Sequence, residues 1–231
     1  MEERIRRYLS LAMFILLLVA FFFSYFKERG KRSFNYSRLI ARAAVFGAIS
    51  TILYVVPVFN LSLPFFPSFL SLHFDEIPAF IAGYAYGPIT ALVVILIKTL
   101  IKLPMSSTLG VGELTDFILS SSFVLSATIL YKKKRNFVGV FSGFGISLII
   151  QNVVALLLNI YVMLPFYIAV MGYDESQLLS LCQMANSSVQ NLGWSYGLCC
   201  VLPFNLFKDA CVLVLTFLIY KILHKPLRWD K

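Results

Sequence analysis

Charged and amide side chains interrupt several long apolar stretches of this sequence, and these residues are the ones that could bind a ligand or do chemistry. Lys98 and Lys102 are spaced i, i+4, and Glu113 and Asp116 are spaced i, i+3, so each pair lies on one helix face. Within a membrane, a charge at the centre of a helix costs about 2.5–3.5 kcal/mol, so such residues are candidates for a functional site. The other residues of this kind are Asp75, Glu76, Gln151, Asn152, Asn159, Asn205, Lys208 and Asp209.

Three roles are open for these polar residues. They could form structural pairs, for example Lys98 with Asp116 or Lys208 with Asp209, or place carboxylates at helix N-termini, where the dipole favours an anion. They could be an acid–base catalyst built from Glu113, Asp116 and Lys98, because such catalysis needs titratable groups within reach of a substrate. Because residues from five expected helices converge on one level of the membrane, we favour the third role, a ligand pocket open to the outside.

The composition shows that the helices carrying these residues cross a membrane. Of 231 residues, 59% are hydrophobic and only 13% are charged, whereas a soluble domain carries about 25% charged residues. This excludes a disordered chain, a coiled coil and a small secreted domain held by disulfides. Since about 20 apolar residues cross a bilayer as a helix, we predict an all-α membrane protein. The uncharged stretches are residues 8–26, 43–74, 77–97, 117–131, 136–173 and 176–207.

The distribution of basic residues predicts how the helices cross the membrane. The net charge is +9, and the lysines and arginines gather at residues 27–42, 132–135 and 221–231, beside apolar stretches. Such clusters are typical of cytoplasmic loops, so we expect a multi-pass membrane protein with a cytoplasmic C-terminus and no nucleic-acid partner. Each cluster is expected to be a solvated basic segment next to the lipid bilayer, rather than a specific site for anionic lipids.

Six membrane-spanning helices, with both ends of the bundle in the cytoplasm, place all three basic clusters on the cytoplasmic side. The expected helices are residues 38–57, 75–86, 88–102, 113–131, 137–167 and 199–223, with residues 60–74 and 171–198 outside.

A further apolar stretch, Tyr8–Phe26, precedes the six helices. We expect an uncleaved anchor with its N-terminus outside, because the basic excess is larger after the stretch than before it. A signal peptide is the alternative, although no Ala-x-Ala cleavage site precedes Lys27. The expected organisation is therefore an anchor and basic linker at residues 1–37, a six-helix domain at 38–224 and a basic tail at 225–231.

The motifs that are missing narrow the function. The sequence has no GxxxxGK[ST], HExxH or GxSxG motif, and its four cysteines show no CxxC or Cys/His spacing. We therefore expect no catalytic residues, no metal site and no cofactor, and we favour the substrate-capturing subunit of a larger machine over an enzyme or a purely structural subunit. Small residues at Ala44 and Ala48, and at Gly139 and Gly143, could let a partner helix or a neighbouring helix approach closely.

Several ordered motifs resemble the substrate-binding (S) components of energy-coupling factor (ECF) vitamin transporters, and most closely the riboflavin-transporter type. The resemblance covers residues 38–224 and leaves the stretch at 8–26 outside. Its motifs are Ser71-Leu-His-Phe-Asp-Glu-Ile-Pro-Ala-Phe80, Gly87-Pro88, Ile97-Lys98, Gly110-Val-Gly-Glu-Leu-Thr-Asp-Phe117, Leu158-Asn159, Leu164-Pro-Phe-Tyr167 and Leu202-Pro-Phe-Asn-Leu-Phe-Lys208.

The resemblance implies a six-helix bundle that captures a vitamin from outside. It also implies a transmembrane coupling protein and two cytosolic ATPases as partners, with small residues of the first helix, here Ala44 and Ala48, docking to the coupling protein. It further implies that Asn205 and Lys208 of the last motif, and Asn159 of the long helix, line the pocket.

This sequence departs from the family pattern at several pocket positions. The usual Asp-Phe-Ser-Asp reads His73-Phe-Asp-Glu76, a usual Lys-Asn reads Lys98-Thr99, and a usual Lys-Gly reads Lys208-Asp209. A usual Asn-Phe also reads Asp116-Phe117, so amide groups are lost and carboxylates gained. These changes could retune the pocket from riboflavin to pantothenate, a pyridoxine-type vitamin or a queuosine precursor, because pockets reject ligands that leave polar groups unpaired. The residues expected to bind the substrate are Asp75, Glu76, Lys98, Thr99, Glu113, Asp116, Asn159, Asn205 and Lys208.

Overall fold

The computed structural model describes residues 35–67, 69–133 and 135–227. The apolar stretch at 8–26, expected to be an anchor, and residues 228–231 of the basic tail lie outside this part. Residues from Leu39 onward form one compact unit, to which the packing described below belongs.

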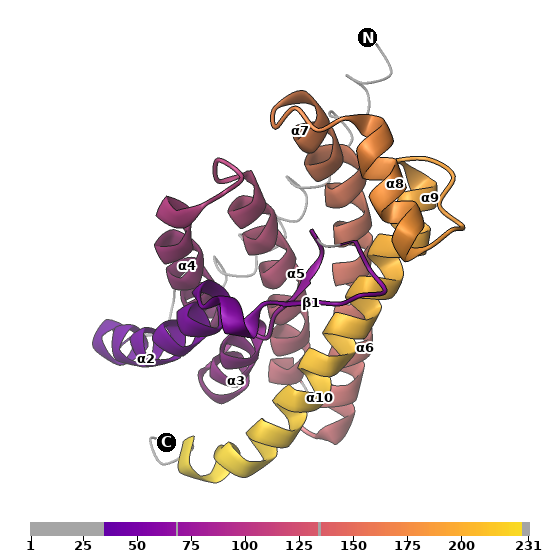
Figure 1. Ribbon diagram of the computed structural model, residues 1–231. Coiled ribbons are helices and arrows are strands. Elements are labelled where there is room, and N and C mark those ends of the chain that lie inside the picture. The colour runs from indigo at the N-terminus through magenta and orange to yellow at the C-terminus, as the bar shows by residue number, and fades with distance from the viewer. Residues whose placement is uncertain (1–34, 68, 134, 228–231) are drawn as a thin grey trace, which may run out of the picture. The chain divides into compact units, whose positions relative to one another are not determined.

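The described chain is almost entirely helical (Figure 1). A two-residue antiparallel pair, β1 (Leu61–Ser62) and β2 (Ser71–Leu72), closes the loop before α3. Single turns lie at Pro57–Phe59 and Leu103–Met105, and π turns lie at Asn159–Met163 and Gly197–Val201. The helices are α2 (Tyr36–Val55), α3 (Glu76–Tyr86), α4 (Pro88–Lys102), α5 (Val111–Lys133), α6 (Phe137–Leu158), α7 (Leu164–Ala169), α8 (Glu175–Ala185), α9 (Trp194–Tyr196) and α10 (Leu202–Leu227).

The prediction of an all-α membrane protein is confirmed. In the described part, five helical stretches are long and apolar enough to span a bilayer: Tyr36–Val55, Pro88–Met105, Val111–Lys133, Val138–Ala169 and Trp194–Leu223.

Two of the expected helices differ from the prediction. The helix expected at 75–86 is α3, whose 11 residues rise only about 16 Å, too short for a core of about 30 Å. The last span begins at Trp194 and not at residue 199, because a π turn joins α9 to α10 without a break. The segment after α7, expected only to be external, contains the helix α8.

Local sequence signals explain several helix ends. Gly87 has φ 109°, a conformation that favours glycine, and Pro88 occupies the first turn of α4, so the chain reverses sharply between α3 and α4. The side chain of Asn136 accepts a hydrogen bond from the Gly139 backbone N–H and caps α6.

The core of the bundle lies where α3, α4, α5 and α10 meet. The Phe80 and Phe123 rings, both fully buried, pack edge to face with centroids 4.9 Å apart. A Cβ atom at Gly143 would lie 3.0 Å from the Ala127 backbone oxygen, so α6 approaches α5 closely at this point. Gly143 therefore lets a neighbouring helix of the same bundle approach α6. The sequence had left open whether this small residue faces such a helix or a partner protein.

Candidate ligand-binding site

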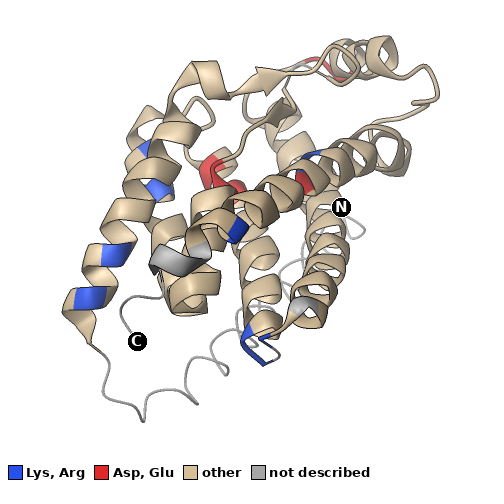
Figure 2. Ribbon diagram, turned by 90° about the horizontal axis from the view of Figure 1, so that it is seen from below, with Lys and Arg blue, Asp and Glu red and all other residues tan. Residues whose placement is uncertain are grey.

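A group of charged residues lies buried inside the bundle, where four helices meet. Figure 2 shows in red and blue the ribbon segments that carry acidic and basic residues. Asp75 and Glu76 begin α3, Lys98 comes from α4, Asp116 from α5 and Lys208 from α10. All but Asp116 are at most 4% exposed, and the Asp116 side chain is 12% exposed. We call these five residues and His73 the ion cluster.

Lys98 has its hydrogen-bonding capacity fully used within the ion cluster. Its ammonium donates to Asp75, to Asp116 Oδ2 at 2.9 Å and to Ser120 Oγ at 2.9 Å. Since a lysine ammonium has three N–H donors, none remains for a ligand in this arrangement. Lys98 and Asp116 thus form the structural pair that the sequence left open as an alternative.

Lys208 pairs with Glu76 and not with Asp209, so the structural pair Lys208–Asp209 that the sequence left open is not formed. Its Nζ donates to Glu76 Oε1 at 2.8 Å and lies 3.4 Å from His73 Nε2. Consecutive residues of a helix point about 100° apart, so Asp209 faces α6 instead, where it accepts a hydrogen bond from Asn152 Nδ2 at 3.2 Å.

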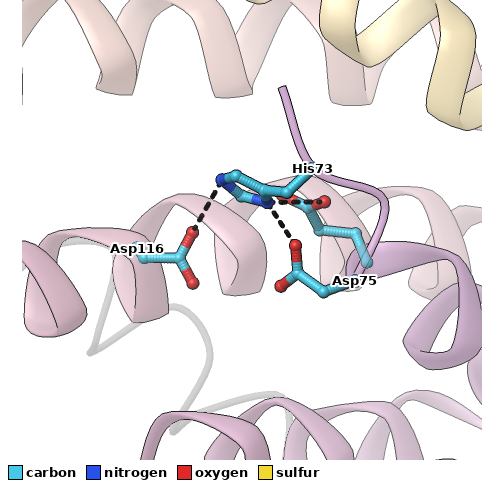
Figure 3. A group of neighbouring side chains, drawn as sticks. His73, Asp75 and Asp116 are labelled. Atoms are coloured by element: carbon cyan, nitrogen blue, oxygen red, sulfur yellow. Dashed lines mark hydrogen bonds and ion pairs between the residues drawn. The ribbon is translucent and has the colours of Figure 1, made fainter. Parts of the chain in front are cut away.

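His73 lies at the centre of the ion cluster, between Asp75 and Asp116 (Figure 3). Its Nδ1 is hydrogen-bonded to Asp75 and is 3.8 Å from Glu76 Oε2, and its Nε2 is 4.0 Å from Asp116 Oδ1. The predicted site did not include His73. Its position at 73–76, where the sequence departs from the family motif, was the one feature that could have identified it.

Tyr54 of α2 covers the ion cluster and was also missed by the sequence analysis. Its ring centroid lies 4.7 Å from Lys98 Nζ and 5.7 Å from the His73 ring. Its position in an apolar helix gave no signal that it would contact charged groups.

Four residues of the ion cluster could together hold a metal ion. His73, Asp75, Glu76 and Asp116 each offer a donor atom, and these atoms lie within 4.8 Å of one another. Two lysine ammoniums already donate to the three carboxylates, so the protein's own cations balance two of the three buried negative charges. We therefore describe the ion cluster as a network of ion pairs.

The other predicted substrate-binding residues are hydrogen-bonded elsewhere. Thr99, Asn159 and Asn205 donate to backbone oxygens of their own helical stretches, at Ile95, Ala155 and Val201 respectively. Glu113 accepts hydrogen bonds from Ser106 and Thr108 of the preceding loop, while Lys98 pairs with Asp116. The alternative catalytic trio of Glu113, Asp116 and Lys98 is thus divided between two hydrogen-bond networks.

A small aromatic pocket lies at the end of the bundle that α8 covers. The Phe69 ring lies 5.9 Å from the Tyr167 ring and 6.2 Å from the Tyr196 ring. Met163 and Leu178 also line the pocket, so it is bounded by the π turn after α6 and by α8. The sequence analysis expected a polar site and did not identify this apolar surface.

Comparisons with known proteins agree with this architecture. Residues 38–220 match the family model described as "ECF transporter, substrate-specific component". The riboflavin transporter RibU of Staphylococcus aureus (strain TCH60) is 27% identical over 192 residues, covering 83% of this chain and 94% of that protein. The riboflavin transporter FmnP of Bacillus subtilis (strain 168) is 25% identical over 184 residues, covering 78% and 90%.

A solved structure, described as the S component of a bacterial ECF transporter, superposes with a TM-score of 0.65 at 25% identity. The match covers 84% of this chain and 99% of that one. The family model, the relatives and the fold all agree with the resemblance found in the sequence motifs, and the chain belongs to the family of substrate-specific components of ECF transporters.

Proposed function

We propose that this protein is the membrane subunit that captures riboflavin from outside the cell for an ATP-driven ECF importer. The relatives described above are named riboflavin transporters, and they align over most of their length. Membership of a family of transporter components also favours a binding protein over an enzyme.

The observation that carries riboflavin as the ligand is the alignment with two riboflavin transporters over most of their length, and the charge balance of the ion cluster agrees with it. Three carboxylates face two ammoniums, with His73 among them, so the ion cluster has no positive excess. Such a site suits a ligand without net charge, such as riboflavin, and disfavours pantothenate, whose carboxylate would be repelled. The aromatic pocket, of about 10 Å³, has room for a flat heterocycle only when its walls move apart, and its rings would then pack against that heterocycle.

We assign different roles to the two buried lysines. Lys98 donates to three acceptors, so it holds the ion cluster together. Lys208 has one carboxylate and one imidazole nitrogen as neighbours, which leaves it a donor for a ligand oxygen. Asn205 lies one turn before Lys208 on the same face of α10, and it is proposed to bind the ligand with Lys208 and Asn159.

The first test is the identity of the molecule that copurifies with the protein. The full chain, purified in mild detergent and then denatured, is expected to release a flavin, identified by its absorbance and by mass spectrometry. A different vitamin in near-stoichiometric amount would replace riboflavin as the ligand. A protein that is empty and also fails to bind any added vitamin would contradict substrate capture altogether.

The coupling protein is proposed to dock on α2 through Ala44 and Ala48. Both alanines are exposed, whereas Ala43 and Gly47 are buried, and a Cβ atom at Gly47 would lie 3.0 Å from the Ile97 side chain of α4. The helix therefore uses one row of small residues inside the bundle and leaves a second row open for a partner helix. Two cytosolic ATPases and a cytoplasmic C-terminus complete the proposed assembly.

Replacing Ala44 and Ala48 with tryptophan is expected to abolish copurification with the coupling protein and ATP-dependent uptake, while ligand binding by the isolated subunit is retained. The bulky rings would keep a partner helix away from α2. Ile149→Trp, on the exposed face of α6, is the control and should assemble normally. Equal assembly of the α2 variant and the control would contradict this docking surface, and uptake by the subunit alone in proteoliposomes would contradict the ATPase partners.

A further inference from the structure

Two cysteines that are 18 positions apart in the sequence come together at the end of the bundle that α8 covers. Cys182 of α8 and Cys200 of the π turn before α10 are 0% and 1% exposed, and their thiols are close enough to interact. Both belong to one apolar cluster that also contains Leu164 and Tyr196.

The backbone holds these two segments together independently of the thiols. Asn186, which ends α8, donates from Nδ2 to the Cys199 backbone oxygen at 3.0 Å. The C-terminal turn of α8 is therefore hydrogen-bonded to the same π turn that carries Cys200. Cys182 and Cys200 therefore lie on two segments that are held side by side, as a disulfide between them requires.

The location of the pair also suits a disulfide. The basic cluster at residues 132–135 lies between α5 and α6, and α6 with its continuation runs from there to the opposite end of the bundle, where α8 follows. If the basic clusters are cytoplasmic, α8 lies outside, where protein disulfides form and persist.

We propose that Cys182 and Cys200 are a redox-active pair whose disulfide fixes α8 over the aromatic pocket. Because both thiols are buried, a small disulfide oxidant such as glutathione disulfide reaches them only when α8 opens locally from the bundle. The thiolate of one cysteine attacks this oxidant, forms a mixed disulfide and releases one glutathione thiolate. The thiolate of the other cysteine then attacks the protein sulfur and releases the second.

The exchange is balanced. The two protein thiols lose two protons and two electrons, and glutathione disulfide takes up both electrons and becomes two thiols. The product covalently joins α8 to the last membrane span.

The expected consequence follows from the pocket lining, and it rests on the proposed function. Cys182 and Leu178 of α8 both line the aromatic pocket, together with Tyr196 and Phe69. A ligand that enters or leaves past α8 needs this wall to move, so the disulfide is expected to slow both steps several-fold. Reduction would restore exchange.

The cross-link is tested by counting thiols in the full-length protein. The protein is treated in detergent with glutathione disulfide or with dithiothreitol, denatured, and alkylated with a maleimide for intact-mass and peptide analysis. The oxidised wild type is expected to take up two fewer maleimides than the reduced one, with a linked peptide that joins Cys182 to Cys200.

The variants Cys182→Ser and Cys200→Ser should lose this difference. Cys199→Ser, which changes the half-buried neighbour of Cys200, should keep it. Four free thiols after oxidation of the wild type, or a linked peptide containing Cys199 or Cys211 instead, would overturn the pair.

The effect on the pocket is tested by the dissociation rate of bound riboflavin. Oxidised wild type and oxidised Cys199→Ser should release it several-fold more slowly than their reduced forms, whereas Cys182→Ser should release it at one rate. Equal rates in a fully cross-linked protein would overturn the control of the pocket by α8. A protein that forms the disulfide but binds no flavin would contradict the proposed function and leave the cross-link established.

Discussion

Replacing Lys98 with methionine is expected to lower the free energy of unfolding by about 3–5 kcal/mol, the usual cost of removing one partner from a buried ion pair. The Lys98 ammonium donates to Asp75, Asp116 and Ser120, and its side chain is 0% exposed. Its loss leaves two carboxylates in the bundle without their cation. The measurement is thermal or denaturant unfolding of the detergent-solubilised protein.

Lys102→Met is the matched control for this variant. Lys102 lies one turn further along α4, is half-buried, and contacts the Tyr54 ring at 5.6 Å. Its removal is expected to cost no more than about 1 kcal/mol. Adding Asp116→Asn to Lys98→Met should recover part of the lost stability, because it removes one of the uncompensated charges. Equal unfolding midpoints for the Lys98 and Lys102 variants would show that the ion cluster does not stabilise the fold.

Lys208→Gln is expected to weaken riboflavin binding by about tenfold to a hundredfold. A hydrogen bond to a charged group contributes about 1.5–3 kcal/mol, and 1.4 kcal/mol corresponds to a factor of ten in affinity. Glutamine retains an amide donor near Glu76 but not the positive charge, so the unfolding midpoint of the variant is measured together with its affinity. Asn205→Ala, combined with it, should abolish measurable binding. Riboflavin fluorescence, quenched on titration with protein, reports the affinity.

The control for Lys208 is Lys221→Gln, an exposed lysine near the end of the same helix. It should bind riboflavin as the wild type does. Unchanged affinity in both Lys208→Gln and Asn205→Ala, with lowered unfolding temperatures, would mean that these residues serve the structure alone.

The amino-acid sequence determined the class and the family of this protein. Low charge and long apolar stretches require membrane-spanning helices, and five described stretches have the necessary length and composition. Helix ends follow local chemistry, as at Gly87-Pro88 and Asn136, because caps and glycine conformations involve only neighbouring residues. The ordered motifs identified the family, and the match over residues 38–220 confirmed it.

The tertiary structure decided which of the polar residues meet. Lys208 and Asp209 are adjacent in the chain but face different helices, and Glu113 is bonded to its own loop although it is spaced to share a face with Asp116. Tyr54 and Cys182 gave no signal in the sequence, and His73 gave only a departure from the family motif. In the structure His73 lies at the centre of the ion cluster, Tyr54 packs against it and Cys182 lines the aromatic pocket.

The physical reason is that sequence spacing fixes the face of a single helix, whereas a site depends on how each helix is rotated and how closely it approaches its neighbours. That approach is set by contacts such as Gly143 against the Ala127 backbone and Gly83 against Thr128, between residues far apart in the chain. Membrane insertion and helix ends are local properties and can be predicted from the sequence. The convergence of charges on His73 arises only once the helices have packed.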